Sequence, residues 1–567
     1  MLVVTGSVVL LPFGTGVAAA ASVEITECTI IDQPGTYVLT GDIEGTTSSA
    51  VPCLRIQSSD VRLDGQGYAV TSAGHGVEVM AADPDNVRLE NVEIRNLVIE
   101  AEKRGITSYR AGTVVDGVDV RTKGGWGVVM QFSDLTITNS SVVLEDVPEP
   151  TQFTLPTRGV YVFSGNLTLA DSTVSITCAT GESCGAGVQL NSNPTVESTV
   201  TVSRTAISAG VGFYGNGDFS LVVIEESEID ARLDGVWSAF GTLDGVVVRD
   251  TDITAGRYGV WLEGDDHAVT DTRVTGPVEV GIALLGDGIR AERNAVTGST
   301  FAGIGVLGES GVLRDNVVTE AAGDGFLVIG TDLSVVRATV NPTVSFVGDD
   351  VSLSAAEAPA DGPGGLVNLG GYATLTLRQA TPLALGLNYT DEDVAGLDES
   401  SLALYRYDGT TGAWVALADG ANDPAANTVS GTLAETAIVA AFGAPATEAV
   451  EVTIDVKPGS DSNPVNPKAR GVIPVAVLKT ADFDPADVTV SSLRFGDSED
   501  VEAGLGAAAV HGGHAEDVDG DGDLDLVVHF DARTAGFDGD ETVAVLVGET
   551  TAGTALVGED AVVTVGR

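Results

Sequence analysis

One short phrase returns at a fixed step near the middle of this chain, and this repeat constrains the fold most. A glycine followed by three mostly apolar residues recurs every 22 residues. The four phrases are Gly259-Val260-Trp261-Leu262, Gly281-Ile282-Ala283-Leu284, Gly303-Ile304-Gly305-Val306 and Gly325-Phe326-Leu327-Val328. A period of about 20–25 residues built from short β-branched runs is typical of a solenoid whose repeats are coils of strands. Because no coil buries its apolar face alone, the coils must stack to form a core.

The glycine step extends toward the N-terminus with wider spacing, at Gly76, Gly105, Gly127, Gly159, Gly187, Gly212 and Gly235. The widest interval holds Val147-Pro148-Glu149-Pro150, which predicts a loop that leaves the coil. Over roughly residues 23–330 the pattern resembles the right-handed parallel β-helix families, namely the pectin-lyase-like (pectate-lyase-like) solenoids and the NosD-type β-helix repeats. The resemblance implies a fold but specifies no activity, because this fold carries many chemistries. The similarity of 34–40 and 61–67 to the entry sequence of NosD-like solenoids predicts a cap over 23–70.

Composition and turn signals divide the chain into four parts. Residues 1–21 contain an apolar run and then small residues, which indicates a signal peptide. Residues 22–330 are the predicted β-helix. Regular short strands with turn signals predict a β-sandwich over 331–446, and residues 447–567 form a C-terminal β domain. The predicted fold class is therefore all-β, a right-handed parallel β-helix solenoid followed by two β-sandwich-like domains.

Four cysteines are consistent with export. An even count permits two disulfides, with three possible connectivities. We predict one disulfide between Cys28 and Cys53 and a second between Cys178 and Cys184. Beyond the signal peptide, no stretch approaches the ~20 apolar residues of a transmembrane segment. We therefore expect a secreted protein that is extracellular or on the cell surface.

The acidic balance of the chain limits its partners. Lysine and arginine number 28 against 81 aspartates and glutamates, a net charge of −53. Such a surface repels phosphate backbones, which argues against a nucleic-acid partner. Two interpretations remain, a hydrated surface of the halophilic type and a surface that collects cations; acids spread along the whole chain favour the halophilic one.

Alternation within each coil assigns side chains to faces. The first and third residues after the glycine point inward, and the second and fourth point outward. The second positions from Gly159 onward are Tyr161, Gln189, Tyr214, Trp237, Trp261, Ala283, Gly305 and Leu327. Since stacked coils lie about 4.8 Å apart, the rings should form an exposed row on one flat sheet. Sugar rings stack on such platforms, and Asn191, Asn216 and Glu263 can bond to hydroxyl groups, which predicts glycan binding. The alternative is that loops or neighbouring rings shield the row.

The last three coils carry apolar residues at outward positions too. These include Ala283, Leu285, Leu307, Leu327 and Ile329. A strand that is apolar on both faces is typically buried on both. We therefore expect the next domain to fold back over this end of the solenoid.

The C-terminal domain contains alternating aspartates, Asp517, Asp519, Asp521, Asp523 and Asp525, with Gly520 and Gly522 between them. The run resembles DxDxDG calcium loops, and the domain resembles a β module found in many secreted bacterial and archaeal proteins. Hard cations take six to eight oxygen ligands, which alternate aspartates on a tight turn supply. Without helices, and with Val528 at the twelfth position, it is more similar to FG-GAP-type sites than to an EF-hand. The resemblance implies Ca²⁺ bound by four side chains and the Asp523 carbonyl; the alternative is an acidic turn.

Two other functions are weighed against glycan binding. A polysaccharide lyase or glycoside hydrolase needs acids grouped on the sheet face, and the candidates are Glu263, Asp265, Asp266 and His267. Asp265, Asp266 and His267 lie between strands, where a polar turn is the simpler explanation, and Glu263 with Arg257 on the strand face is too little for a lyase, so the sequence favours a protein that is not an enzyme. A NosD-like periplasmic copper-associated protein comes third, because three methionines without His/Met clusters offer little to copper.

Overall fold

The computed structural model describes residues 22–565 apart from 46–50, 148–156, 181–183, 194–195, 239–242, 277, 341, 349, 379–380, 447–448, 503 and 540. The predicted signal peptide at 1–21 and the predicted Pro148–Pro150 loop lie outside the described residues. By contacts, the chain forms two compact units. One contains the residues up to 394 together with 402–443, and the other contains 395–401 and 444–567.

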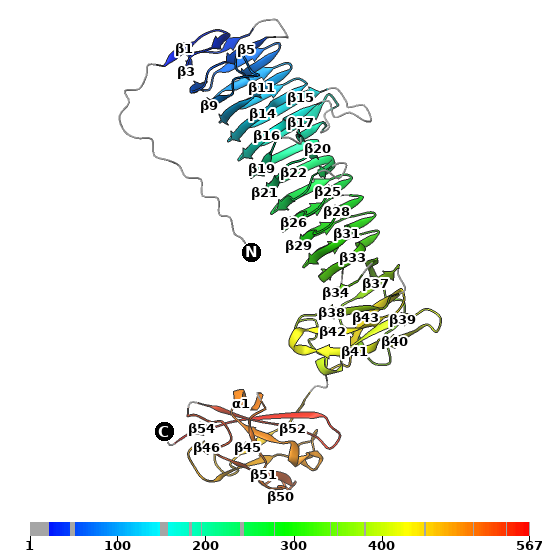
Figure 1. Cartoon of the computed structure of the whole chain (residues 1–567). Coiled ribbons are helices and arrows are strands. Elements are labelled where there is room, and N and C mark those ends of the chain that lie inside the picture. The colour runs from blue at the N-terminus through cyan, green and yellow to red at the C-terminus, as the bar shows by residue number, and fades with distance from the viewer. Residues whose placement is uncertain are drawn as a thin grey trace. The chain divides into compact units, whose positions relative to one another are not determined.

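In the first unit the strands stack in three parallel ladders, which we number 1 to 3 (Figure 1). Ladder 1 contains β2 (Thr29–Ile31), β5 (Pro52–Ile56), β8 (His75–Val79), β11 (Arg104–Tyr109), β14 (Trp126–Thr138), β16 (Arg158–Ala170), β18 (Ala186–Asn191), β20 (Ala206–Asn216), β22 (Glu228–Ser238), β25 (Tyr258–Glu263), β28 (Val280–Leu285), β31 (Ala302–Arg314) and β33 (Asp324–Thr339). Several of these strands turn a corner and serve two ladders. The predicted parallel β-helix is confirmed.

The other two ladders complete each coil. Ladder 2 contains β1 (Val23–Ile25), β3 (Gly35–Leu39), β6 (Val61–Asp64), β9 (Leu89–Arg95), β12 (Ala111–Asp116), β19 (Thr199–Ser203), β21 (Leu221–Glu225), β23 (Val246–Arg249), β26 (Ala268–Thr270) and β29 (Arg290–Glu292), with parts of β14, β16, β31 and β33. Ladder 3 contains β4 (Ile43–Glu44), β7 (Ala69–Ser72), β10 (Val98–Ala101), β13 (Asp119–Thr122), β15 (Ser141–Val147), β17 (Thr173–Cys178), β24 (Asp252–Ala255), β27 (Arg273–Thr275), β30 (Ala295–Thr297) and β32 (Val317–Thr319), with parts of β20, β22 and β33.

The repeated glycine has a steric cause. It lies where the chain enters ladder 1 and approaches ladder 3 inside the coil. A Cβ added at Gly281 would lie 2.2 Å from Cγ1 of Val296 and 2.5 Å from the carbonyl oxygen of Gly303. Real Cβ atoms do not make such contacts, so only glycine fits without displacing its neighbours. The apolar residue that follows, such as Ile282 or Val260, is fully buried and forms the core.

Polar side chains at the turns join one coil to the next. The buried Asn294 accepts a hydrogen bond from the backbone N–H of Thr272 at 3.0 Å, and Asn316 accepts one from the N–H of Asn294 at 3.0 Å. The amide group of Asn316 also donates to the carbonyl oxygen of Ala291 at 2.8 Å. Because buried backbone groups need partners, these stacked asparagines satisfy turn groups that no strand can pair.

Two expectations about the ends of the solenoid are wrong. Within the described residues, 23–70 form ordinary coils, since β1 already pairs in parallel with β3 (Val23 with Tyr37). At the other end the outward apolar residues differ: Leu307 is 48% exposed, Leu285, Leu327 and Ile329 are partly exposed, and Ala283 is buried within ladder 1. The next residues extend the ladder instead, because β35 (Val351–Ala356) pairs antiparallel with β33 (Phe326 with Leu353). The apolar residues at these outward positions pack against one another along ladder 1, as Leu285 and Leu327 do against Ala283, and this explains the apolar pattern in the sequence.

Antiparallel strands continue from the last coil. One set runs from β35 through β37 (Tyr372–Leu377), β43 (Ala437–Gly443), β39 (Ala403–Asp408) and β40 (Ala413–Ala416), with β36 (Val367–Asn368) beside β43. The other runs from β34 (Thr343–Val347) through β38 (Leu383–Asn388) and β42 (Thr428–Leu433) to β41 (Ala418–Asp423). The β-sandwich over 331–446 stays a prediction.

The second unit has its own core, in which Phe495, Phe530 and Leu546 are fully buried. Its larger sheet contains β44 (Val450–Glu451), β53 (Ala555–Ala561), β52 (Val543–Glu549), β48 (Arg494–Gly496) and β49 (Ala507–Ala508). A four-stranded sheet contains β45 (Ile454–Val456), β47 (Val472–Val477), β51 (Asp525–Asp531) and β50 (His514–Glu516), and β46 (Pro464–Val465) pairs with β54 (Val563–Thr564). The described short helices of this unit are α1 (Ser498–Glu502) and the 3-10 turns Glu399–Ser401, Pro485–Asp487 and Val490–Ser492; the 3-10 turn Pro424–Ala426 belongs to the first unit.

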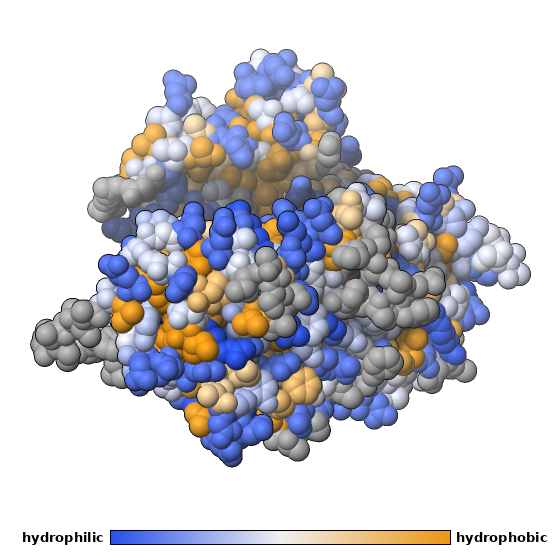
Figure 2. All heavy atoms as spheres, turned by 90° about the horizontal axis from the view of Figure 1, so that it is seen from above, coloured by the Kyte–Doolittle hydropathy of each residue, from blue (hydrophilic) through white to orange (hydrophobic). Residues whose placement is uncertain are grey.

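Both predicted disulfides are present: Cys28–Cys53 joins the residue before β2 to β5, and Cys178–Cys184 joins the last residue of β17 to the segment before β18. Among the described residues, no helix has the length and hydropathy to cross a membrane. Seen from above, hydrophilic residues cover much of the described surface and apolar residues gather between them in small groups (Figure 2). This surface agrees with a chain whose acids far outnumber its bases.

Candidate functional site

The outward face of ladder 1 carries a row of aromatic rings. Tyr214 of β20, Trp237 of β22 and Trp261 of β25 occupy consecutive register positions on parallel strands. All three side chains are partly exposed, while their chain neighbours Phe213, Val236 and Val260 are buried inside the coils. The ring centroids of Tyr214 and Trp237 lie 5.1 Å apart. The structure therefore places these residues as the alternation indicates.

A second line of rings, which the sequence reasoning missed, runs beside the first. Trp126 and Tyr258 each stand directly before a coil glycine and are partly exposed. The ring centroids of Trp126 and Tyr161 lie 5.4 Å apart, and those of Tyr258 and Trp261 lie 4.6 Å apart. An aromatic residue directly before the coil glycine is the sequence signal that could have predicted these two rings. The aromatic pairs lie on β14 and β16, on β20 and β22, and on β25, and β18 between them carries Gln189 at the ring position.

Neighbouring side chains shield part of this surface. Gln189, between Tyr161 and Tyr214 in register, is buried and accepts a hydrogen bond from Nε of Arg158 at 2.5 Å. Trp261 and Tyr258 pack against the buried Val280, Ala283 and Ala302. Burial also raises the pKa of Tyr214 above its ordinary value of 10.0. Each ring is thus supported from one side and partly open on the other.

The polar residues predicted beside the rings are within reach of them. The amide Nδ2 of Asn191 donates to the hydroxyl of Tyr161 at 3.2 Å, and Oδ1 of Asn191 is buried without a hydrogen-bond partner. Asn216 is the register neighbour of Asn191. Oε1 of Glu263 accepts from Nε1 of Trp261 at 3.0 Å. Aromatic surface with a few convergent polar groups is typical of a small-ligand or sugar site.

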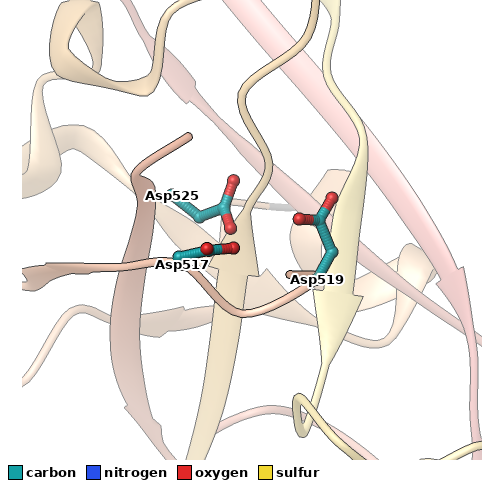
Figure 3. A group of neighbouring side chains, drawn as sticks. All are labelled: Asp517, Asp519 and Asp525. Atoms are coloured by element: carbon teal, nitrogen blue, oxygen red, sulfur yellow. The ribbon is translucent and has the colours of Figure 1, made fainter. Parts of the chain in front are cut away.

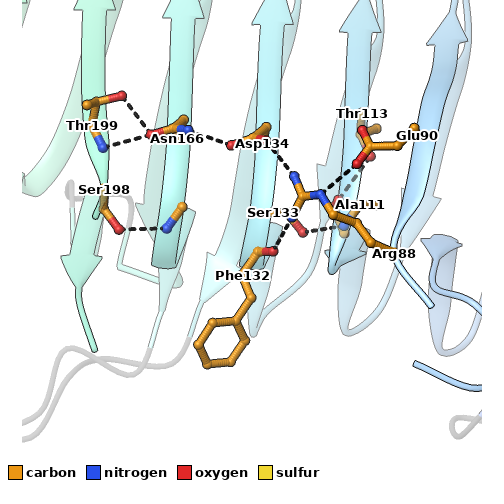
Figure 4. A network of polar contacts seen from close by, with 12 residues as sticks. Arg88, Glu90, Ala111, Thr113, Phe132, Ser133, Asp134, Asn166, Ser198 and Thr199 are labelled. Carbon is orange, nitrogen blue, oxygen red and sulfur yellow. Dashed lines mark hydrogen bonds and ion pairs between the residues drawn. The ribbon is translucent and has the colours of Figure 1, made fainter. Parts of the chain in front are cut away.

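A polar cavity of about 380 Å³ lies at the corner between ladders 1 and 2, near Phe132 and Asp134. Arg88 is its hub (Figure 4): Nε contacts Glu90 at 2.8 Å, Nη1 donates to the carbonyl oxygen of Phe132 at 2.9 Å, and Nη2 contacts Asp134 at 2.5 Å. Asn166 extends this hydrogen-bond network, because its Nδ2 donates to Oδ1 of Asp134 at 2.7 Å. Because these groups satisfy one another across successive coils, the network holds the corner together.

The candidate catalytic residues do not form a catalytic group. His267 is fully buried, and its Nδ1 accepts the N–H of Val246 at 3.2 Å. Burial lowers the pKa of His267. Asp265 accepts the backbone N–H of Asp287 at 2.9 Å and donates its own N–H to Asp244 at 2.9 Å, as one step of a stacked turn. Full burial therefore argues against a catalytic role for His267, and within the described part of the chain no acid–base partner faces Glu263 or Asp266 in this turn.

The aspartate turn before β51 brings three carboxylates together (Figure 3). Oxygen atoms of Asp517, Asp519 and Asp525 all lie within 4.8 Å of one another, a donor set made wholly of oxygen. Asp525 is buried and accepts the backbone N–H groups of Lys479 at 2.8 Å and Val518 at 3.0 Å. Three converging carboxylates fit a hard cation such as Ca²⁺.

The carboxylates of Asp521 and Asp523 are not part of this group. Because Asp523 is predicted to bind through its carbonyl oxygen, the position of its carboxylate does not bear on that prediction. Oδ1 of Asp521 accepts the backbone N–H of Asp523 at 2.8 Å, and Oδ1 of Asp523 lies 3.8 Å from Nζ of Lys479. Both carboxylates are exposed at the tip of the turn. Alternation along the sequence could not separate them from the other three, because the tight turn rather than strand geometry decides the direction of each side chain.

No protein-family model and no curated protein matches this chain. Among solved structures it is similar to the tailspike protein of E. coli bacteriophage HK620 in complex with pentasaccharide, at 10% identity and a TM-score of 0.42 over 72% of this chain and 86% of that one. It is also similar to the Dettilon tailspike protein (8%, TM-score 0.29, over 74% and 86%) and to an exopolygalacturonase from Thermotoga maritima (10%, TM-score 0.28, over 55% and 83%). Similarity at this level assigns no activity to this chain.

Proposed function

We propose that this protein is a secreted, extracellular or cell-surface β-helix that binds a glycan along the outward face of ladder 1. The observation that carries the proposal is a set of partly exposed ring pairs on ladder 1: Trp126 of β14 with Tyr161 of β16, Tyr214 of β20 with its register partner Trp237 of β22, and Tyr258 with Trp261, both of β25. Apolar rings exposed on a flat sheet cost hydration free energy unless a ligand covers them. The apolar face of a sugar ring covers such a surface while its hydroxyls stay solvated.

The rings are supported in a way that suits binding more than core formation. Packing of Tyr258 and Trp261 on Val280 and Ala283 fixes the ring orientations before a ligand arrives. Preorganised rings lose little conformational entropy on binding.

The test is a glycan array screened with calcium at high salt, comparing the wild type with Trp237→Ala plus Trp261→Ala. We expect binding at least tenfold weaker in the double variant, or about 1.4 kcal/mol. Tyr68→Ala is the matched control, since Tyr68 is 37% exposed but lies between ladders 2 and 3. Unchanged binding by a folded double variant would refute the role of the row.

The same samples separate the alternatives. Release of reducing or unsaturated sugar from acidic polysaccharides would identify a polysaccharide lyase or hydrolase. A tight site in a copper titration would favour the NosD-like alternative. Binding without either result is the outcome that the glycan proposal requires.

We also propose that Asp517, Asp519 and Asp525 bind one Ca²⁺ that stabilises the second unit. Three carboxylates within 4.8 Å repel one another, and a divalent cation removes that repulsion. Bound cation would then contribute to folding of this unit, because the unfolded chain holds no such site. The halophilic character of the protein is proposed from its net charge of −53 alone.

A further inference from the structure

Positive charge is scarce in this chain, yet two arginines at the N-terminal end of the aromatic surface have no acidic partner. Several other arginines on the coils pair with a carboxylate of an adjacent coil, as Arg204 does with Asp171 and Arg293 with Asp271. Arg104 and Arg158 have no ion pair within the described parts of the chain, although acids outnumber bases 81 to 28.

These two arginines enclose one ring. Arg104, Trp126 and Arg158 occupy the same register position on β11, β14 and β16. Their guanidinium carbons lie 4.5 and 5.1 Å from the centroid of the Trp126 ring, and the guanidinium of Arg158 also lies 4.9 Å from the Tyr161 ring. Stacking on a ring holds each planar guanidinium in place. Nε of Arg158 donates to Gln189, which leaves the two Nη groups of that guanidinium for a ligand.

The surroundings compensate this positive charge only in part. Glu78 on β8 acts to raise the pKa of Arg104, but less than burial lowers it, and Glu78 is itself paired with Arg55 at 2.6 Å. Burial lowers the pKa of both Arg104 and Arg158 from the ordinary value, because desolvation penalises the charged forms. The pKa of His75, the register neighbour of Arg104, is lowered by burial and then by Arg104, Lys103 and Arg55. An anion placed between the arginines would relieve this desolvated charge.

We propose that Arg104, Trp126 and Arg158 form a subsite for an acidic sugar, one that carries a carboxylate or a sulfate ester. The inference rests on the proposed glycan binding and adds a ligand class to it. The Trp126 and Tyr161 rings take the apolar face of the sugar. The guanidinium edges donate paired hydrogen bonds to the anionic oxygens, a geometry that suits both carboxylate and sulfate. The excess of acids elsewhere repels anions that do not fit this subsite.

The test uses two matched pairs of polymers in titration calorimetry, alginate with its propylene glycol ester and dextran sulfate with dextran. At 1 M NaCl the Debye length is about 3 Å, so the net charge of the protein no longer repels a polyanion. We expect the wild type to bind at least one charged polymer tenfold more tightly than its uncharged partner. Preference for alginate identifies carboxylate, and preference for dextran sulfate identifies sulfate.

Arg104→Gln plus Arg158→Gln should abolish that preference, and Arg121→Gln, at an exposed arginine of ladder 3 paired with Asp119, should retain it. Equal binding of charged and uncharged polymers by the wild type, or a preference that survives in the double variant, would overturn the proposal. The wild-type comparison decides the matter even if the double variant does not fold. Uncharged binding that is lost only in Trp237→Ala plus Trp261→Ala would keep the proposed function and remove this subsite.

Discussion

At the scale of the residue, hydrogen-bond satisfaction separates structural groups from candidate binding groups. Inside the turns, Asn294 and Asn316 use their amide groups on backbone partners of adjacent coils. On the outward face, Trp237 and Trp261 keep part of their rings accessible. A ligand can compete for the rings without breaking the fold, whereas removal of a buried asparagine leaves orphaned N–H groups.

The buried His267 should make the stability of the first unit depend on pH. Burial lowers its pKa below the ordinary 6.5, so the unfolded chain takes up the proton at a higher pH than the folded chain does. Its contribution to stability is complete above pH 6.5 and declines as the pH falls toward the lowered folded pKa. We expect the melting temperature of the first unit to decrease from pH 7 to pH 5.

Substitution of His267 tests whether this residue causes the pH dependence of the melting temperature. His267→Gln keeps an acceptor for the N–H of Val246 but does not titrate, so the decrease in melting temperature should be smaller. The exposed His514 of the second unit is the control, and His514→Gln should behave as the wild type. Equal pH dependence in His267→Gln and the wild type would show that other groups, such as His75, are responsible.

At the scale of the element, the turn between β50 and β51 shows how a strand pair positions ligands. Glu516 and Asp525 face each other at the start of the pairing, so the turn begins and ends at one point. The backbone N–H groups of Gly520 and Gly522 are bonded to the carboxylate of Asp517 at 2.8 and 3.2 Å. The turn is thus organised around Asp517, with Asp519 and Asp525 beside it.

Calcium should therefore stabilise the second unit. At a calcium concentration 100 times the dissociation constant, binding to the folded state alone adds about 2.7 kcal/mol to its unfolding free energy. We expect chelation to lower the melting temperature of this unit and added Ca²⁺ to restore it. Asp517→Asn plus Asp519→Asn should lose the response, and Asp482→Asn, at an exposed residue outside the group, should keep it. A wild type without any calcium response would refute the site.

At the scale of the whole molecule, the three ladders provide a long, regular scaffold whose surface charge is strongly negative. Ion pairs such as Arg249–Glu225 and Arg337–Asp315 join coils, but the 28 bases can neutralise only part of the 81 acids. The remaining acids repel one another, and compact states suffer more from this repulsion than expanded ones do.

Salt should consequently stabilise the protein. Raising NaCl from 0.05 to 1 M shortens the Debye length to about 3 Å and screens the repulsion more than it weakens the few ion pairs. We expect a higher melting temperature in 1 M NaCl, measured by circular dichroism. Sucrose of equal osmolarity is the control, because it strengthens burial without screening charge. A melting temperature that does not change with salt would contradict the halophilic interpretation.

The sequence by itself determined the coil repeat, the inward and outward faces, the two disulfides and the line of Tyr214, Trp237 and Trp261. These follow from local geometry, because alternate residues of a strand point to opposite faces and a registered repeat stacks like on like. Only the tertiary structure decided which residues of different coils touch, as in Arg104, Trp126 and Arg158. It also decided that His267 is buried, and that Asp521 and Asp523 stay apart from the other aspartates. These contacts, the burial of His267 and the positions of the aspartates depend on the register between distant segments and on the conformation of turns. Neither property produces a periodic pattern in the sequence from which it could be predicted.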